Sequence, residues 1–544
     1  MMEYGKMLRV LSGAGKGRKD IDMKIRNSFF AGLCSAALAA NLLPVSAEGV
    51  KTDFYEATSD NVRILGRTVY NEDALWFANS AAGVEFKATG SQVTFNINVS
   101  GDPTRVGVYL NGQLYQRGVI GGKSASARKA SITVPLAEGE NTVKLLKLSE
   151  GPQSTIAIDS IETDEGGILT PTAAKEKKLE FIGDSITCGY GIDLPLKDPE
   201  TKKNNSFSTK SEDASKTYAF QIAEKLDADV NMFAGSGYGI WCSYGGGREN
   251  VMGNFYTKCG PNTWNSISAS SYTLIQSFDW DFSNYQPDCV VINLGTNDWS
   301  YFSSHGGEVG DFEDSYIDFL GMVRANNPNA KIVCTLGMMG ADLYPNVESA
   351  VDYYKEDTGD SEVYLLELAP INASTEGYGV DYHPMPATNT RVANDELGPF
   401  IAELMGWELG EMPDDGTLTL TPDNLVTGEY HEQPAHTEHE DSSEADTDVS
   451  DASKEDVSSV SSTSASSADS SDSSSDSKDS SSSADSSKNS SAGGTSSASK
   501  ANNASTANST AANNSNSNPT TGFAGGMAMI ALMGGAVIIS KRKK

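Results

Sequence analysis

Two short motifs carry residue types that together cleave esters. Ser185 lies in Gly-Asp-Ser-Ile-Thr, and His383 lies in Asp-Tyr-His-Pro far along the chain. A serine hydroxyl becomes a good nucleophile when a neighbouring base takes its proton, and histidine is the usual base. Of the other four histidines, three lie in an acidic tail and one, His305, lies in a polar Gly-rich loop. We therefore predict that Ser185 is a nucleophile and that His383 is its base.

Acyl transfer also needs hydrogen-bond donors for the negative charge that develops on the carbonyl oxygen. Gly237 lies in Ala-Gly-Ser-Gly, and Asn297 lies in Gly-Thr-Asn-Asp. The backbone N–H groups of Ser185 and Gly237 and the side-chain amide of Asn297 supply three such donors without adding a charge. Gly235 is the alternative to Gly237. The predicted oxyanion hole is therefore Ser185, Gly237 and Asn297.

The segments that carry these motifs alternate between strand-like and helix-like patterns. Buried apolar runs predict strands, and amphipathic runs predict helices. The predicted strands are residues 179–182, 230–233, 289–294, 331–336 and 363–366, and the predicted helices are residues 218–226, 314–326 and 392–405. This alternation indicates a parallel sheet in a three-layer α/β/α domain, residues 175–410. Ligands of such folds bind beyond the carboxyl ends of the strands, where Ser185, Gly237 and Asn297 are expected.

Residues 50–165 show a different pattern. Short runs that alternate or carry β-branched residues are separated by turn signals such as Asn111-Gly112. These runs are residues 93–99, 106–110, 130–134 and 142–148. Short strands at regular spacing predict a small all-β sandwich of the jelly-roll kind. No catalytic group is predicted in this domain, which could bind carbohydrate or support its neighbour.

The four motifs in this order resemble the SGNH (GDSL-type) hydrolases, and specifically carbohydrate esterase family 2. The resemblance covers roughly residues 60–405 and includes residues 181–191 (FIGDSITCGYG) and 142–150 (TVKLLKLSE). The G-x-S-x-G motif of the α/β-hydrolases is absent around Ser185. The resemblance implies a β-sandwich before an SGNH-type domain. It also implies a serine O-acetyl esterase that acts on plant polysaccharide through an acetyl-enzyme intermediate, without a cofactor.

The acid of the catalytic triad departs from the pattern of the broader superfamily, which has an aspartate three residues before the histidine. Val380 occupies that position here, and Asp381 lies only two residues before His383. In an extended segment, residues two apart point the same way, so Asp381 is a candidate third member. The resemblance to family 2 implies an alternative, in which a backbone carbonyl holds the imidazole. We expect this Ser185–His383 dyad.

Two tryptophans lie close to the predicted oxyanion hole in the sequence. Trp299 follows Asn297 by two residues, and Trp241 follows Gly237 by four. Each is a candidate sugar platform, because an aromatic face packs against the C–H groups of a sugar ring. Each is equally well explained as a packing residue, because tryptophan is commonly buried.

The cysteines give no sign of a metal site. No CxxC or Cys/His spacing typical of metal ligands is present, so we predict no metal. Cys242 and Cys259 flank a Gly-rich loop and could form a disulfide in an oxidising compartment. Cys289 and Cys334 lie in apolar strand runs and are predicted to be core residues.

Both ends of the chain predict export. A basic segment, an apolar run at residues 29–43 and Val-Ser-Ala at 45–47 have the order of a signal peptide, residues 1–47. At the other end, Asn-Pro-Thr-Thr-Gly at 518–522 precedes an apolar run and a basic tail. Residues 518–544 resemble a Gram-positive sortase signal of the LPxTG kind. The resemblance implies that a sortase attaches the protein to peptidoglycan, with a C-terminal transmembrane anchor as the alternative.

Residues 414–517 form a polar segment before that signal. Beyond residue 437 it consists mainly of Ser, Asp, Ala, Asn and Thr, a composition that cannot bury enough apolar surface to fold. Residues 408–500 hold 21 acidic and 4 basic residues, and so carry −17 of the net charge of −32. We therefore predict a disordered spacer. The acidic balance also argues against nucleic-acid binding.

The sequence as a whole predicts a secreted, wall-anchored serine esterase that removes acetyl groups from xylan, glucomannan or a similar polysaccharide. One rival is a lipid esterase or thioesterase of the SGNH type, but no long apolar lid segment favours it. The other rival is a non-catalytic carbohydrate-binding surface protein. The intact Ser185, Gly237, Asn297 and His383 argue against a decayed site.

Overall fold

The computed structural model describes residues 51–122, 128–306, 309–412 and 423–433 of the 544-residue chain. The chain divides into two compact units, residues 1–441 and 442–544, and every described residue belongs to the first. The predicted signal peptide (1–47), the predicted sorting signal (518–544) and residues 434–517 of the predicted spacer lie outside the described residues. Within the described ranges, no helix combines the length and the apolar character needed to cross a membrane.

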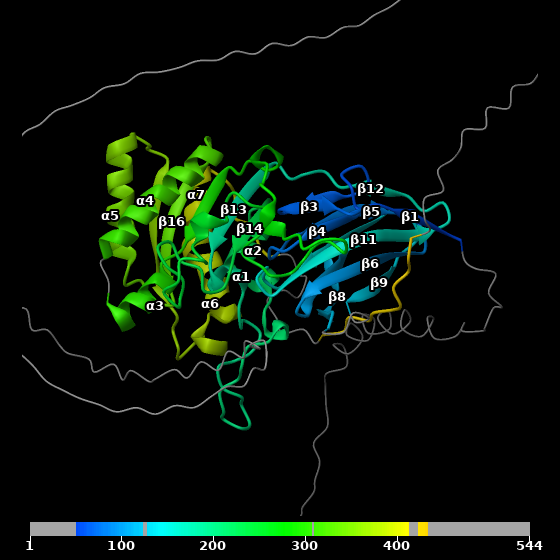
Figure 1. Cartoon of the computed structure of the whole chain (residues 1–544), viewed down its shortest axis with the longest axis horizontal. Helices are drawn as coiled ribbons and strands as arrows, with labels where there is room; N and C mark the ends of the chain where they lie inside the picture. The colour runs from blue at the N-terminus through cyan, green and yellow to red at the C-terminus, as the bar shows by residue number, and fades with distance from the viewer. Residues whose placement is uncertain (1–50, 123–127, 307–308, 413–422, 434–544) are drawn as a thin grey trace, which may run out of the picture. The chain divides into compact units, whose positions relative to one another are not determined.

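Two antiparallel sheets form the N-terminal domain (Figure 1). The first sheet contains, in spatial order, β3 (Thr68–Asn71), β4 (Ala74–Phe77), β11 (Ser154–Asp164), β6 (Gln92–Gly101) and β9 (Lys129–Pro135), with β1 (Thr52–Tyr55) paired to β11. The second contains β12 (Leu169–Pro171), β5 (Gly83–Ala88), β10 (Asn141–Lys147), β7 (Thr104–Leu110) and β8 (Gln113–Ile120), with β2 (Arg63–Leu65) paired to β5. Side chains of both sheets pack between them, among them Phe86 and Phe95, with ring centroids 5.7 Å apart. The sandwich core is therefore continuous.

The turn between β7 and β8 illustrates how local sequence sets this architecture. Asn111 and Gly112 adopt left-handed φ angles of 53° and 81°. Two successive residues with positive φ are typical of a type I′ turn, whose twist matches the twist of a two-residue β-hairpin. The Asn-Gly signal in the sequence thus marks a tight hairpin.

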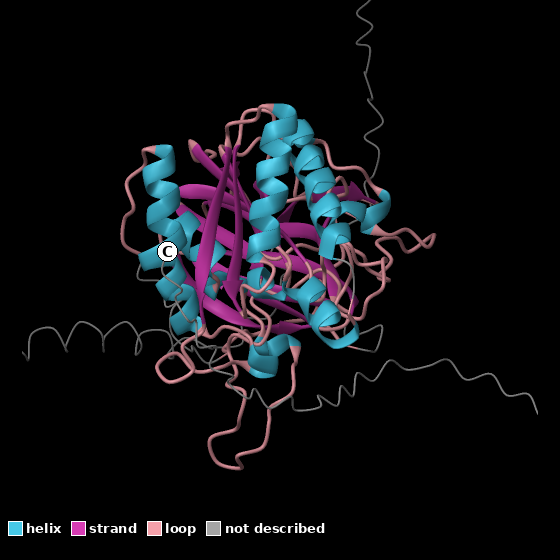
Figure 2. Ribbon diagram, turned by 90° about the vertical axis from the view of Figure 1, so that its left-hand side faces the viewer, coloured by secondary structure: helices cyan, strands magenta, loops and turns pink. Residues whose placement is uncertain are grey.

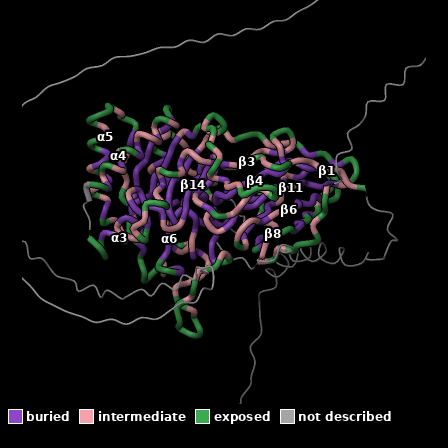
Figure 3. Tube along the Cα trace, in the orientation of Figure 1, coloured by how far each residue is buried: buried purple, intermediate pink, exposed green. Residues whose placement is uncertain are grey.

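A five-stranded parallel sheet forms the second domain, with helices on both faces (Figure 2). Its strands, in spatial order, are β14 (Ala228–Ala234), β13 (Lys177–Gly183), β15 (Cys289–Asn293), β16 (Lys331–Met338) and β17 (Val363–Pro370). Its helices are α1 (Ser185–Cys188), α2 (Tyr218–Lys225), α3 (Thr296–His305), α4 (Val309–Asn326), α5 (Tyr344–Thr358), α6 (Pro386–Arg391) and α7 (Leu397–Met405). The central strand β15 is wholly buried, as expected for a sheet covered on both faces. Figure 3 shows the interior of the domain around β14 mostly in purple, the colour of buried residues. The sandwich and the α/β/α domain confirm the predicted fold class.

The two faces of the parallel sheet are covered by different helices. Side chains of α2 and α7 pack on one face, and side chains of α3, α4 and α5 pack on the other. From β13 the chain passes to its neighbour β14 on one side, and it then crosses back to β15 on the other side of β13. The carboxyl ends of β13 and β15 therefore flank a topological switch point, the place where ligands bind in such folds. Ser185 follows β13 by two residues.

The sandwich is joined to the parallel domain by buried ion pairs. Arginines of the sandwich reach carboxylates of the α/β domain: Arg67 with Glu180 at 2.9 Å, Arg105 with Asp193 at 2.7 Å, and Arg117 with Asp213 at 2.6 Å. All six side chains are buried. A buried charge left without its partner costs about 3–5 kcal/mol, so each domain depends on the other. This arrangement favours the supporting role among the two left open for the sandwich.

Residues 423–433 correct the predicted start of the disordered spacer at residue 414. Asn424 and Leu425 donate backbone hydrogen bonds to the carbonyl of Arg117 at 3.1 and 3.2 Å, and Gly428 pairs with Ser131. Further along, Tyr430 and His431 bond to carboxylates of β11. The prediction was wrong for these residues because composition takes no account of backbone hydrogen bonds to a strand edge.

The cysteines of the described residues are free thiols, so Cys242 and Cys259 do not form the disulfide left open above. Cys259 donates to the carbonyl of Asp279 at 3.4 Å and packs with Trp76 of the sandwich. Cys242 lies in a loop whose backbone is held by Asp298. The two thiols thus belong to different packing environments.

Candidate active site

Ser185 and His383 meet at the carboxyl end of β13. Ser185 is the first residue of α1, and the carboxylate of Asp184 caps that short helix by accepting the N–H of Ile186 at 2.9 Å. The Oγ atom of Ser185 lies 2.7 Å from Nε2 of His383, and both side chains are 8% exposed. This is the hydrogen bond through which a base activates a nucleophile. The two residues predicted from the sequence are therefore together.

The other imidazole nitrogen of His383 faces the backbone. Nδ1 lies 3.1 Å from the carbonyl oxygen of Val380, the residue that stands where the superfamily has its aspartate. An Nδ1–H donated to that carbonyl leaves Nε2 free to accept the proton of Ser185. Burial lowers the pKa of His383 to about 4, against which the Val380 carbonyl and the charge of Asp381 act. The imidazole is therefore neutral at neutral pH, as a base must be.

The carboxylate of Asp381 does not bond to the histidine ring. The premise of an extended segment was wrong, because residues 380–382 form a tight turn in which Asp381 and Tyr382 have φ angles of 51° and 67°. The carboxylate of Asp381 accepts a hydrogen bond from the Tyr190 hydroxyl at 2.9 Å, and no hydrogen bond joins it to the His383 ring. The geometry thus favours the dyad over the triad.

Two backbone N–H groups at the site have no acceptor among the described residues. They are those of Ser185 and Gly237. The amide of Gly235, the alternative donor, is already bonded to the carbonyl of Gly183 at 3.3 Å. Gly237 has a φ of 80°, a left-handed conformation that favours glycine. The arrangement therefore favours Gly237 over Gly235 as the second backbone donor.

Asn297 lies in the first turn of α3, beside the nucleophile. Its Nδ2 atom donates to the carbonyl of Tyr238 at 2.7 Å and to the carboxyl of Asp184 at 3.2 Å. The side chain is thus close to Ser185, yet both of its N–H groups are engaged. The longer contact, to Asp184, is the one that an oxyanion would replace. Burial raises the pKa of Asp184 to about 7, with the nearby Asp298 adding to the effect.

Asp298 is a residue of the site to which the sequence assigned no role. Its buried carboxylate accepts the N–H groups of Ile240, Trp241 and Cys242 at 3.0, 2.8 and 2.9 Å. These residues continue the loop that begins at Gly237. Asp298 therefore ties that loop to the first turn of α3. An acidic residue directly after Asn297 was the available signal, although sequence alone does not reveal its three partners.

Aromatic side chains surround the dyad, but they are different from the predicted pair. The Tyr190 ring lies 4.5 Å from the His383 ring and stacks on Phe207 at 4.0 Å. Tyr382, next to the histidine, is 43% exposed. Tyr244 is also exposed, and its N–H donates to the carbonyl of Gly237 at 2.9 Å. Sequence reasoning missed these residues because they come from separate loops.

The two tryptophans proposed as sugar platforms are half-buried and pack against the core beside α3 and α4. The Trp241 ring stacks on Phe302 at 5.1 Å, and the guanidinium of Arg248 lies 4.6 Å from its centroid. The Trp241 ring therefore has two close protein contacts, which favours packing. His305, the rival base, lies at the end of α3, stacked on Tyr301 and exposed.

Matches to two family models divide the chain as the two folds do. Residues 179–396 match the GDSL-like lipase/acylhydrolase family, and residues 64–172 match the N-terminal domain of carbohydrate esterase 2. These ranges cover the parallel domain with its dyad and the β-sandwich. The two matches are consecutive, in the order that the resemblance implied.

Individual relatives agree with these families. Over 331 residues the chain is 33% identical to the cellulase/esterase CelE of Acetivibrio thermocellus, and the match covers 59% of this chain but only 37% of that relative. It is 24% identical to an acetylxylan esterase/glucomannan deacetylase of Cellvibrio japonicus, over 64% of this chain and 91% of that relative.

Among solved structures, the fold matches a family two carbohydrate esterase from Clostridium thermocellum in complex with cellohexaose. The TM-score is 0.55 and the identity 31%, over 64% of this chain and 99% of that chain. The site, the two family matches and this coverage lead to one conclusion. The chain belongs to the GDSL-type hydrolases and, within them, to carbohydrate esterase family 2.

Proposed function

We propose that this protein is a serine O-acetyl esterase that releases acetate from acetylated plant polysaccharide such as xylan or glucomannan. The observation that carries the proposal is the 2.7 Å contact between Ser185 Oγ and His383 Nε2, beside two backbone N–H groups that have no acceptor in the part of the chain that the structure describes. The names of the relatives support the substrate class, since they include an acetylxylan esterase/glucomannan deacetylase.

In the first half of the reaction, Ser185 Oγ attacks the carbonyl carbon of the acetyl ester while His383 Nε2 takes the hydroxyl proton. The carbonyl oxygen becomes an oxyanion, stabilised by the N–H groups of Ser185 and Gly237 and by the amide of Asn297. When the tetrahedral species collapses, the bond to the sugar oxygen breaks. The imidazolium of His383 protonates that oxygen, so the deacetylated sugar leaves as an alcohol.

In the second half, water replaces the sugar. His383 Nε2 takes a proton from the water as it attacks the acetyl-Ser185 carbonyl, and the same donors stabilise the second oxyanion. Collapse expels Ser185 Oγ, which recovers its proton from His383. Acetate leaves and the free enzyme returns. The Val380 carbonyl holds the Nδ1 proton throughout, so the imidazole keeps the tautomer that both halves require.

Aromatic residues at the lip of the site fit a sugar ligand. Tyr382 and Tyr244 are exposed; Tyr382 directly precedes His383, and the Tyr244 N–H bonds to the Gly237 carbonyl. Rings of this kind can pack on the apolar face of a pyranose while their hydroxyl groups remain in water. We therefore include Tyr382 and Tyr244, in place of Trp241 and Trp299, as the candidate sugar platforms.

The test of the substrate class is acetate release from a panel of acetylated glycans, measured beside hydrolysis of p-nitrophenyl esters of increasing chain length. Acetate should be released from acetylated xylan or glucomannan, and the rate with p-nitrophenyl esters should fall steeply from acetyl to butyryl. Rates that stay level or rise with longer acyl chains would replace the proposal with a lipid esterase. Glycan binding without hydrolysis of any ester would support the non-catalytic rival.

We further propose that the protein is secreted and that a sortase links it to peptidoglycan through residues 518–522, with the acidic segment as a stalk. The order of signal peptide, polar segment and sorting signal in the sequence supports this location. Cell fractionation of a Gram-positive host tests it. The full chain should leave the wall only after muramidase digestion, and a chain that ends at residue 517 should appear in the medium. Release of the full chain by detergent alone would indicate a membrane anchor.

A further inference from the structure

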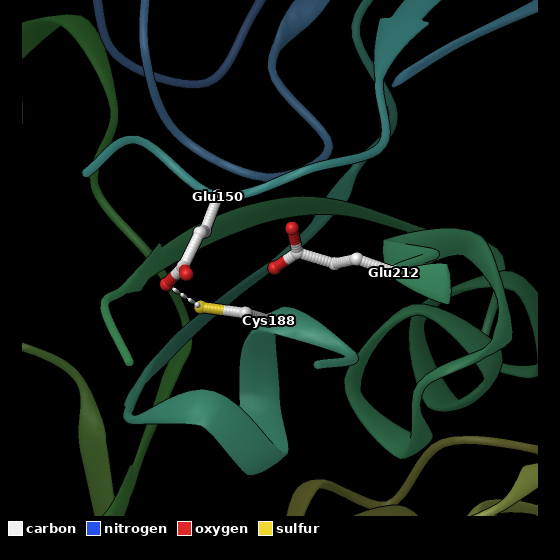
Figure 4. A group of neighbouring side chains, drawn as sticks. All are labelled: Glu150, Cys188 and Glu212. Atoms are coloured by element: carbon white, nitrogen blue, oxygen red, sulfur yellow. Dashed lines mark hydrogen bonds between the residues drawn. The ribbon is translucent and has the colours of Figure 1, made fainter. Parts of the chain in front are cut away.

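A group of buried ionisable side chains lies behind the nucleophile, between the sandwich and the parallel domain. It consists of Glu150, Cys188 and Glu212, whose donor atoms all lie within 4.8 Å of one another (Figure 4). All three side chains are 0% exposed. Cys188 ends α1, the helix that begins with Ser185, and Glu150 follows β10 of the sandwich. The group therefore links the accessory domain to the nucleophile.

The chemistry of this group argues against a metal ion. The Lys147 ammonium lies in the same buried space, where it donates to the carbonyls of Ser149 and Glu150 at 2.6 and 2.8 Å. It thus supplies the positive charge that a cation would bring. Burial raises the pKa of the Glu212 carboxyl and that of the Cys188 thiol well above their usual ranges, so both favour their neutral forms. A metal would have to displace two protons beside an ammonium group.

Glu150 makes the contact that bears on catalysis. Its Oε2 atom accepts the backbone N–H of Ser236 at 2.6 Å, and the Cys188 thiol lies 3.7 Å from the same oxygen. Ser236 stands directly before Gly237. One carboxylate of the sandwich therefore touches both the loop that carries the Gly237 donor and the helix that begins with Ser185.

Other bonds hold the loop on the far side of Gly237: the Tyr244 N–H donates to the Gly237 carbonyl at 2.9 Å, and Asn297 Nδ2 donates to the Tyr238 carbonyl at 2.7 Å. The N–H of Gly235 bonds to Gly183, and the N–H of Tyr238 bonds back to Gly235 at 3.2 Å. The bond from Ser236 to Glu150 fixes the Gly235–Ser236 peptide plane, which is one peptide before the plane that carries the Gly237 N–H. The Gly237 N–H has no acceptor among the described residues, and the bonded residues on either side of it set its direction. Without the Glu150 acceptor, the N–H of the half-buried Ser236 would lose its partner and the loop would shift to satisfy it.

We propose that Glu150, supplied by the sandwich, is a positioning residue that holds the Gly237 N–H in the oxyanion hole. This inference rests on the proposed serine mechanism. On this account the sandwich completes the active site, in addition to supporting its neighbour. A displacement of about 1 Å in a catalytic group can cost roughly 10²-fold in rate. Glu150→Ala should therefore lower kcat by roughly that factor with little change in KM, because the donor acts on the transition state.

The experiment measures phosphonylation of Ser185 by a fluorophosphonate, together with kcat and KM for p-nitrophenyl acetate. The phosphonyl oxygen occupies the oxyanion hole, so the labelling rate reports on Gly237 whatever the natural ester is. Glu150→Gln retains an oxygen that can accept the Ser236 N–H and should label at nearly the wild-type rate. Glu150→Ala and Glu150→Asp, whose carboxylate is too short to reach, should both label roughly 10²-fold more slowly. Should the alanine variant not fold, the aspartate variant decides.

Glu212→Gln is the matched control, because it alters the same buried group without touching the 235–237 loop. It should label at the wild-type rate even if its melting temperature falls. Well-folded Glu150→Ala or Glu150→Asp with wild-type labelling would overturn the inference, as would Glu150→Gln as slow as Glu150→Ala. Rapid labelling of the wild type without acetate release from any glycan would refute the proposed substrate and leave the role of Glu150 intact. A wild type that is not labelled at all would overturn both.

Discussion

His383 is oriented by a carbonyl rather than by a carboxylate. The Val380 oxygen accepts from Nδ1 at 3.1 Å, and the turn that brings it there forces Asp381 and Tyr382 into left-handed conformations. Fixing a tautomer needs an acceptor but not a charge. The aspartate that the sequence offered as a third member instead bonds to Tyr190. The negative charge of a triad aspartate, which usually stabilises the imidazolium, is therefore replaced here by the dipole of the Val380 carbonyl.

The first prediction separates the dyad from a triad. Asp381→Asn should keep most of the kcat, within about 10-fold, since loss of a true triad aspartate costs about 10⁴-fold. His383→Ala should remove nearly all activity because His383 is the only base bonded to Ser185 among the described residues. The measurement is kcat with p-nitrophenyl acetate, with circular dichroism to confirm folding. A thousand-fold loss in a well-folded Asp381→Asn variant would restore the triad.

The second prediction concerns the acid limb of the pH profile. Burial lowers the pKa of His383 from 6.5 to about 4, and catalysis needs the neutral form, which dominates above that pKa. The kcat/KM should therefore stay level as the pH falls through 6.5 and decline to half near pH 4. The same shift stabilises the fold above pH 6.5 and loses that contribution between pH 6.5 and 4. An acid limb centred near 6.5 would mean that the imidazole is solvated in the working enzyme.

At the scale of residues, the sequence predicted the catalytic pair better than the residues that hold the catalytic groups in place. Ser185 and His383 were identified because no other pair combined a strand-end serine with a histidine outside the polar segments. The contact of Asp381 could not be predicted from the sequence. Its positive φ changes the direction of the side chain, and such a φ is uncommon for residues other than glycine. Glu150 and Asp298 bind backbone N–H groups, which every residue except proline has, so no residue type marks these partners in the sequence.

At the scale of elements, the end of β13 and the loop after β14 hold the donors together. The carboxylate of Asp298 accepts three successive N–H groups from that loop, of Ile240, Trp241 and Cys242. Removing this acceptor leaves three donors unpaired in a buried setting, at about 1–3 kcal/mol each before the loop relaxes. The loop also leads to Gly237, so its order and the oxyanion hole are coupled.

The third prediction is that Asp298→Ala lowers the free energy of unfolding by about 3 kcal/mol and also lowers kcat. Urea unfolding of the variant and its kcat with p-nitrophenyl acetate are the two measurements. Asp357→Ala, an exposed acidic residue of α5, is the control and should change stability by less than about 0.5 kcal/mol. Equal stability of the two variants would show that the loop holds its shape without Asp298.

The strands of the parallel sheet could be predicted from the sequence because buried parallel strands are nearly continuous apolar runs. The last helix was harder. The apolar pattern predicts one helix at 392–405, whereas the structure has α6, a wide turn at Val392–Glu396 and α7. Pro399 lies in the first turn of α7, where it lacks an N–H and crowds the carbonyl four residues before it. The periodicity of side chains does not show such a break in the backbone.

At the scale of the whole molecule, the sandwich and the parallel domain share charges that neither can bury alone. Arg67 and Glu180 lie 113 residues apart in the sequence, and Arg117 and Asp213 lie 96 apart. Composition and periodicity predicted two domains, but pairs this distant leave no local pattern. The dependence of one domain on the other could therefore only be found in the structure.

The fourth prediction is that residues 175–410 alone do not form a stable domain. Glu180 would lose Arg67, and Asp193 and Asp213 would lose their arginines and keep only Lys216. Breaking a buried pair costs about 3–5 kcal/mol, which is a large share of the usual 5–15 kcal/mol stability of a domain. Residues 51–433 should by contrast unfold in one cooperative transition. Calorimetry of both pieces makes the comparison. A soluble, active 175–410 piece with a melting temperature close to that of the longer piece would refute the dependence.

The central claim is that Ser185 carries the acetyl group during release from a glycan. The most direct measurement is acetate released from acetylated xylan or glucomannan by the wild type and by Ser185→Ala, with Ser243→Ala as a control whose hydroxyl makes no hydrogen bond within the described residues. The wild type and Ser243→Ala should release acetate at similar rates, and Ser185→Ala should release none above background. Retention of more than a few per cent of the rate in a folded Ser185→Ala variant would contradict the serine mechanism.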